Sequence, residues 1–278
     1  MSSTASENGG PIGLFNEKRE NRKTYWLGTS GFSYDDWVGE VYPPGLPKKK
    51  WFDYYTKSFN ALELNMSYYR LPSERVIHSL CRRAFPGFLL TVKANKTITH
   101  GGDPSLLEAY NKLLEIPDTY DVAGMLLLQF PYSFHYNPKN FDYVKRLCDA
   151  TRTKTAVEFR NREWINADTL NWAETNRVMW VSVDEPDFEK LMPSKLYETA
   201  GIYVRFHGRN AEKWWQHERA YERYDYLYTK EELLPWAQKI RLVDKKPAVF
   251  YFNNHYKGKS VKNAKLFSKL LEKTGNDG

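Results

Sequence analysis

The sequence predicts one α/β domain, a single (β/α)₈ TIM-type barrel. Short β-type runs alternate with amphipathic helical runs from Tyr25 onward, and no low-complexity linker interrupts them. A length of 278 residues is ordinary for one such barrel. An open doubly wound sheet is the alternative. The first strand is followed by GTSGFS, which lacks the Gly-x-Gly-x-x-Gly pattern of dinucleotide-binding sheets, so the barrel is favoured.

The predicted strands are short runs rich in β-branched and aromatic residues, bounded by polar or turn-forming segments. Each is followed by enough chain for a helix that returns to the start of the next strand. In chain order the strands are 25–30, 61–65, 88–94, 124–130, 155–160, 179–184, 202–207 and 248–253.

The helical runs fall between these strands. Ser73 is a suitable N-cap residue, and Thr229 with Glu232 has the spacing of a capping box. The helix expected after the sixth strand, 187–197, is weak because Pro193 interrupts it. The other predicted helices are 47–59, 73–85, 103–116, 138–150, 166–176, 229–243 and 260–273.

Composition and charge limit the location and the partners. We interpret residues 1–23 as a disordered tail and residues 24–278 as the barrel domain. A net charge of +7 is compatible with an anionic small molecule or a nucleic acid as partner, and equally with solvated surface lysines. Cys81 and Cys148 give no disulfide framework, and no apolar run is long enough for a membrane span. The sequence therefore predicts a cytoplasmic protein without membrane contact, of undecided oligomeric state.

Polar side chains recur toward the ends of the predicted strands. Alternation along each strand places Glu63, Lys93, Glu158, Asp184 and His207 on the face that points into the barrel. Barrel active sites lie at the C-terminal ends of the strands, and buried charges are costly unless they are paired or used. This pattern favours a ligand-binding mouth. A self-satisfied ionic network that fills the barrel is the alternative.

These five residues are the catalytic candidates. Glu63 or Glu158 would act as base and Lys93 as electrostatic stabiliser, while His207 could titrate near neutrality. An anion site requires Lys93, Arg160 and Arg205 to converge instead of pairing separately with carboxylates. The predicted substrate-binding residues are Ser30, Asn65, Tyr69, Gln129, Arg160, Arg205, Trp214, Asn253, Asn254 and Lys259.

A metal site is the competing interpretation of the same strands. Glu158, Asp184 and His207 are acceptable ligands for Mn, Mg or Zn. The nearby cations Lys93 and Arg160 would repel a metal ion, however, and the eighth strand offers asparagine in place of a carboxylate. We therefore assign no metal site and expect no cofactor.

The predicted loop after the seventh strand, 208–228, is long and combines aromatic with basic residues. It could form a lid or a surface that stacks on bases or sugars. It could equally pack its own aromatic residues over the top of the barrel, and the sequence does not decide between these two possibilities.

Taken together, the motifs resemble the YecE-like family, a domain of unknown function (DUF72) that forms TIM-type barrels. They occur in the family's order and cover most of the chain between Thr29 and Ala264. One departure is Asn161 in AVEFRNREW, where the family often has histidine. The matching stretches are GTSGFSYDDWVGEVYP, LELNMSYYRLP with the preceding run from Tyr54 to Phe59, FLLTVKANKTITH, LLLQFPYSF, AVEFRNREW, VSVDEP, YVRFHGR and FYFNNHYKGKSVKNA.

The resemblance implies the fold and a shared site at the strand ends, but no reaction. Three functions follow from the residues. The first is an enzyme acting on a phosphorylated or polyhydroxylated anionic substrate by acid–base catalysis, with Arg160 and Arg205 as anion clamps. The second is nucleic-acid binding without catalysis, through the net charge and the aromatic loop. The third is a metal-dependent hydrolase or isomerase.

Overall fold

The computed structural model describes residues 25–219, 221–243 and 247–272, so the predicted tail 1–23 lies outside the described residues. Eight parallel strands close into a barrel in chain order, with the first strand paired to both the second and the eighth. This confirms the predicted (β/α)₈ fold. The strands are β1 (Tyr25–Ser30), β2 (Ala61–Leu64), β3 (Leu89–Lys93), β4 (Ala123–Gln129), β5 (Lys154–Glu158), β6 (Met179–Asp184), β7 (Ile202–Phe206) and β8 (Ala248–Phe252).

The α-helices occupy the connections, as predicted for most of them. Asn137 and Asn166 cap α5 and α6 through their side chains, and Thr229 with Glu232 forms the predicted capping box of α8. Within 187–197 the described chain contains no helix, which agrees with the weak signal there. The helices are α1 (Trp51–Tyr55), α2 (Glu74–Arg83), α3 (Lys96–Thr99), α4 (Leu107–Glu115), α5 (Pro138–Ala150), α6 (Ala167–Thr175), α7 (Ala211–Trp215), α8 (Lys230–Leu242) and α9 (Lys259–Glu272).

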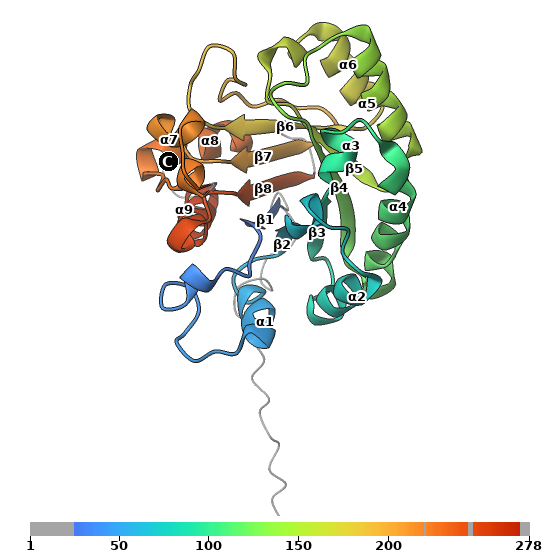
Figure 1. Ribbon diagram of the computed structural model, residues 1–278. Helices are drawn as coiled ribbons and strands as arrows, with labels where there is room; N and C mark the ends of the chain where they lie inside the picture. Colours follow the sequence, from blue (N-terminus) through green and yellow to red (C-terminus); the bar gives the residue numbers. More distant parts are fainter. Residues whose placement is uncertain (1–24, 220, 244–246, 273–278) are drawn as a thin grey trace, which may run out of the picture.

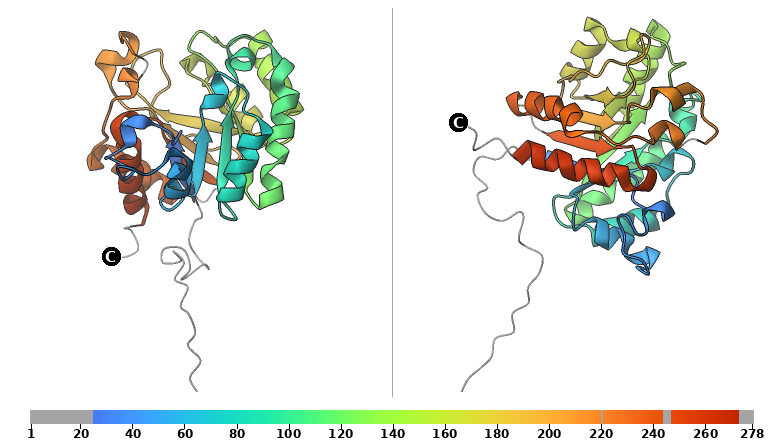
Figure 2. Two further views of the ribbon diagram at one scale, coloured as in Figure 1. Left: turned by 60° about the horizontal axis from the view of Figure 1, so that its bottom comes forward. Right: turned by 90° about the vertical axis from the view of Figure 1, so that its left-hand side faces the viewer.

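The outer faces of the strands pack against the helices. Figure 1 shows β6, β7 and β8 side by side, with α7 beyond their arrowheads. The rings of Phe206 and Phe252 stack at 4.4 Å, and both contact Phe267 of α9. Helix α9 lies against α8 along the outside of the barrel (Figure 2). Burial of such rings contributes about 1.5–3 kcal/mol each, so this aromatic layer fixes the wall from which β7 and β8 present their inward side chains.

The inner face holds side chains from strands that are far apart in the sequence. Residues at equivalent positions of neighbouring parallel strands point to the same side, as Glu63 and Thr91 do. The Thr91 hydroxyl lies 3.0 Å from the Tyr251 hydroxyl of β8, across the lumen. The lumen is therefore filled with side chains, and a ligand can enter only above this layer, at the C-terminal ends of the strands. No helix in the described ranges is long and apolar enough to cross a membrane.

Candidate functional site

The deepest polar layer of the barrel is a buried ion-pair network centred on Arg205. The Nε atom of Arg205 donates to Glu63 Oε2 at 2.8 Å, and Nη1 donates to Glu158 Oε2 at 2.6 Å. Glu63 also accepts hydrogen bonds from Ser30 Oγ at 2.6 Å and from the Tyr203 hydroxyl at 3.2 Å. Burial opposes the charge of Arg205, but the two carboxylates outweigh it and raise its pKa. Arg205 is thus neutralised from within the protein.

A second layer lies above it and is organised by Arg160, whose side chain is 12% exposed. Its Nε atom is 2.7 Å from Glu158 Oε1, and its Nη1 atom donates to Glu185 Oε2 at 2.5 Å. The Nη2 atom is 3.0 Å from Nε2 of His207. A guanidinium can only donate hydrogen bonds, so this nitrogen of His207 accepts from Arg160 when it carries no proton; the same nitrogen also lies 3.3 Å from Glu158 Oε1. Asn253 lies 3.0 Å from the other ring nitrogen.

The pKa values in this layer are shifted in opposite directions. Burial and the positive charge of Arg160 lower the pKa of His207 well below its usual range. Burial raises the pKa of Glu185 to about 7, although Arg160 opposes this shift. One oxygen of Glu185, Oε1, is buried and has no hydrogen-bond partner within the described residues. For Glu158 the two arginines overcome the effect of burial and hold the pKa well below the usual value. Glu158 is consequently a weak base, whereas Glu185 can exchange a proton near neutrality.

Lys93 differs from both arginines because it has no carboxylate partner among the described residues. It ends β3, is partly exposed, and its Nζ atom lies 4.4 Å from the centre of the Tyr68 ring. Burial and the positive charge of Arg205 lower the pKa of Lys93 to about 7, while the carboxylates of Glu158 and Glu63 oppose the shift. Lys93 is therefore an amine of which a large fraction is uncharged at neutral pH.

The remaining predicted residues near the mouth lie at different depths. Gln129 is buried and its amide donates to the carbonyl of Phe130 at 2.8 Å. Asn65 follows β2, and its Oδ1 atom is buried without a described partner. Tyr69 is 73% exposed, so its side chain is accessible on the rim and does not enter the barrel. The structure thus brings Ser30, Arg205 and Asn253 into the ionic layers but leaves Tyr69 outside them.

The predicted inward orientation of Asp184 is wrong. Its carboxylate points to the outer side of the barrel, where it accepts hydrogen bonds from Arg209, from the Tyr228 hydroxyl at 2.8 Å and from Trp236 of α8 at 2.7 Å. Ser182, two residues earlier on the same face of β6, also lies on the outer side, and its hydroxyl accepts a hydrogen bond from the backbone N–H of Tyr197 at 2.8 Å. In a closed parallel barrel both faces of a strand are buried, so apolar residues do not reveal which side faces the helices.

The acidic residue that β6 presents to the lumen is Glu185, one position beyond Asp184. The sequence analysis missed Glu185 because it placed Asp184 on the inward face, and neighbouring residues of a strand point to opposite sides. With Asp184 facing outward, the predicted metal set of Glu158, Asp184 and His207 does not assemble. The described part of the chain contains no group of three or more His, Cys, Asp or Glu residues placed to hold a metal ion.

Three other predicted binding residues belong to the 208–228 loop and its supports. Trp214 is buried, with the guanidinium groups of Arg160 and Arg223 lying 6.0 and 5.4 Å from its ring. Asn254 donates to the Tyr226 carbonyl at 2.8 Å, and Lys259 pairs with Asp225. These contacts fix the loop over the barrel and support the packing interpretation of its aromatic residues.

Sequence reasoning also missed the aromatic rim of the mouth. Tyr34 stacks on His255 at 4.5 Å, and the Tyr68 hydroxyl lies 3.2 Å from Nε2 of His100. Tyr34 of GTSGFSYDDW and His255 of NNHYKG were not predicted as site residues. Their position directly after strands was the available signal.

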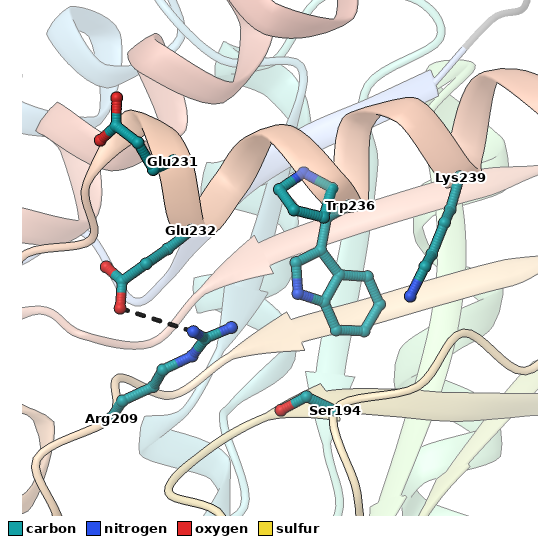
Figure 3. A pocket seen from close by; sticks show the side chains of 7 residues that line it. Ser194, Arg209, Glu231, Glu232, Trp236 and Lys239 are labelled. Carbon is teal, nitrogen blue, oxygen red and sulfur yellow. Dashed lines mark hydrogen bonds and ion pairs between the residues drawn. The ribbon is translucent and has the colours of Figure 1, made fainter.

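A separate hollow of about 290 Å³ lies outside the barrel wall, beside α8 (Figure 3). Ser194, Arg209, Glu232 and Lys239 are among its lining residues, and Arg209 is 3.5 Å from Glu232. Its charged groups are exposed or already paired with one another. The strand-end mouth is the better candidate for chemistry, because its pKa values are shifted and Lys93 has no carboxylate partner in the described part of the chain.

The comparisons with known proteins agree with the barrel fold. The family model described as "Protein of unknown function DUF72" matches residues 26–277. The chain belongs to the DUF72 family. It is 27% identical over 272 residues to the UPF0759 protein YunF of Bacillus subtilis (strain 168), covering 89% of this chain and 94% of that protein.

Two crystal structures of DUF72 proteins share the fold. One from Thermotoga maritima has a TM-score of 0.81 and 36% identity, covering 89% of this chain and 99% of that one. One from Enterococcus faecalis has a TM-score of 0.76 and 22% identity, covering 89% and 95%, and shows the fold alone. Neither description names an activity, so the function has to be argued from the site.

Proposed function

We propose that this DUF72 protein is an enzyme that binds a small anionic substrate, phosphorylated or polyhydroxylated, at the C-terminal mouth of the barrel. The observation that carries the proposal is Lys93, a partly buried amine at a strand end without a described carboxylate partner. Such a cation is unfavourable unless something compensates its charge. A bound anion would supply the compensation.

The neighbouring groups fit distinct roles. Arg160 lies above Arg205 and is 12% exposed, so it would anchor the anionic group beside Lys93. Glu185, with a pKa of about 7, would be the acid–base group. Glu63 and Glu158 are engaged by arginine, which supports a structural role for them instead of the role of base. His207 would hold Arg160 in place.

Anion-induced thermal stabilisation tests this proposal. Inorganic phosphate and glucose 6-phosphate should raise the melting temperature at about pH 6, where Lys93 is protonated, and less at about pH 9. Lys93→Met should abolish the effect. Lys154→Met is the matched control, because Lys154 is exposed and is the first residue of β5, at the opposite end of the strands from the mouth. Equal stabilisation of both variants by these anions, or none in the wild type, would refute an anion site at Lys93.

Nucleic-acid binding is the second candidate. Trp215 is 52% exposed, Tyr69 is 73% exposed, and the net charge is +7. Exposed rings near cations are typical of surfaces that stack on bases. A binding constant for single-stranded DNA that falls steeply with salt, and falls again in Trp215→Ala, would support this candidate.

We also infer a cytoplasmic location, which the free cysteines Cys81 and Cys148 support.

A further inference from the structure

We propose that Lys93 forms an imine with a carbonyl group of the substrate, so that the substrate class is a small anionic aldehyde or ketone. This inference rests on the proposed function, because the same mouth has to hold the anionic group. It adds a covalent step that an anion site alone does not require.

The surroundings of Lys93 favour a reactive amine over a structural cation. Its Nζ atom contacts the face of Tyr68 and has no ion pair or hydrogen bond within the described ranges. The charged groups that act on it are Arg205 and Arg160, which disfavour its protonation, and Glu63 and Glu158, which favour it.

Those two carboxylates are already paired with arginines. Both are engaged by Arg205, and Glu158 also by Arg160, so they offset the arginines without forming a salt bridge to Lys93. His100, which hydrogen-bonds Tyr68, has a pKa lowered to about 4 by burial and by Lys93, so it adds no positive charge near neutrality.

The position of the amine suits the reaction. Lys93 ends its strand at the mouth and is partly exposed, so a small carbonyl compound can reach it from solvent. Arg160, whose side chain is 12% exposed, lies at the same mouth and could hold a carboxylate or phosphate of the same molecule. A lysine desolvated beside cationic groups is a recognised arrangement for an amine nucleophile.

The step balances without any further reagent. The uncharged Nζ attacks the carbonyl carbon and forms a C–N bond, giving a carbinolamine. The carbonyl oxygen then leaves as water, carrying the two protons that the amine has lost, and a C=N bond remains. No oxidant or reductant is consumed, and hydrolysis restores the lysine.

Borohydride trapping tests the inference. The full-length protein is incubated with glyoxylate or dihydroxyacetone phosphate at about pH 7, reduced with borohydride, and mapped by mass spectrometry. A pKa three units below an ordinary lysine gives about a thousandfold more free amine. A less basic amine is also less nucleophilic, which offsets part of this gain. We therefore expect Lys93 to be modified roughly tenfold or more faster than exposed Lys154.

Two further experiments test the roles of the anionic group and of the amine separately. Glycolaldehyde, an uncharged aldehyde, should react with Lys93 more slowly than glyoxylate if the anionic group is bound. Lys93→Arg retains the positive charge and cannot form an imine, so it should keep the stabilisation by phosphate and lose the trapped adduct. Circular dichroism of this variant establishes that it is folded.

The outcomes separate the two proposals. Stabilisation by anions without trapping at Lys93 would overturn the imine and leave the anion site. Trapping at Lys93 that does not depend on a negative charge would support the imine and contradict the anionic substrate. Modification of Lys93 at the same rate as Lys154 would overturn the inference, because the amine would then have no special reactivity.

Discussion

Arg205→Met removes the cation that joins two carboxylates at the bottom of the mouth. The arginine is 1% exposed and both glutamates are fully buried, so neither carboxylate can recover its hydration. Removing one partner of a buried ion pair costs about 3–5 kcal/mol. Two carboxylates lose a partner here, so we expect a loss at the upper end of that range. This is a large part of the roughly 5–15 kcal/mol by which folded domains are stable.

Urea unfolding followed by far-ultraviolet circular dichroism measures the effect. Arg152→Met is the matched control, since Arg152 also pairs with two carboxylates, those of Glu108 and Glu115, but is 52% exposed. Exposed pairs contribute only about 0–1 kcal/mol, so this control should change the unfolding midpoint little. Added phosphate should not rescue Arg205→Met, because an anion cannot replace the missing cation.

The pH dependence gives a second test of the same reasoning. The folded-state pKa of Glu158 lies well below its usual value, so its ion pairs contribute stability that is present above the unfolded pKa and is lost as pH falls through the folded pKa. In Arg205→Met one of its two arginines is absent and Glu158 protonates more readily. The stability gap between wild type and variant should therefore narrow as the pH is lowered from neutrality, because the variant takes up a proton on Glu158 at a higher pH than the wild type does. A gap that is no larger than that of Arg152→Met, or that widens in acid, would refute the account of a buried network.

Two further variants test residues that the structure reassigned. In Glu185→Gln, stability relative to the wild type should improve as pH rises from 4.5 to about 7. In that window the carboxyl of the unfolded wild type ionises while the buried carboxyl stays protonated, so wild-type stability falls with rising pH. The full change is about 3 kcal/mol at about 1.4 kcal/mol per pKa unit, and a flat difference across this window would contradict the assignment. Asp184→Asn should lower stability by about 1–3 kcal/mol, because Arg209, Tyr228 and Trp236 lose an anionic acceptor. Borohydride trapping at Lys93 should stay unchanged in this variant, and a loss of trapping would contradict the outward position of Asp184.

The strand pattern was sufficient to predict the barrel, because eight βα units of adequate length leave few ways to bury parallel strands. It also placed Glu63 and Arg205 in the lumen, where a charged residue between apolar neighbours marks the inner face. The same reasoning failed on β6. Asp184 faces outward because Trp236 and Arg209, which follow it by 52 and 25 residues, supply its hydrogen bonds there. Partners so distant along the chain cannot be identified from local alternation.

Pairing within the site was equally hidden. Alternation along the strands predicted that Lys93, Arg160 and Arg205 lie at the mouth. It could not predict which of them pair with carboxylates, because the partners come from other strands. The structure answers this for each cation. Arg205 has two carboxylates, Arg160 shares one of them and adds Glu185, and Lys93 has none among the described residues.

The ion pairs of Arg205 and the pKa of Lys93 are linked. The amine of Lys93 is held uncharged in part by Arg205, and Arg205 remains charged in the interior because Glu63 and Glu158 enclose it. Removing Arg205 would withdraw a repelling cation from Lys93 and expose it to two unpaired carboxylates. Both changes raise the pKa of the lysine, so the fraction of free amine at neutral pH would fall by about tenfold for each pKa unit gained. The buried network that stabilises the barrel is therefore also what would make Lys93 reactive, and the structural and catalytic interpretations of the inward charges need not exclude each other.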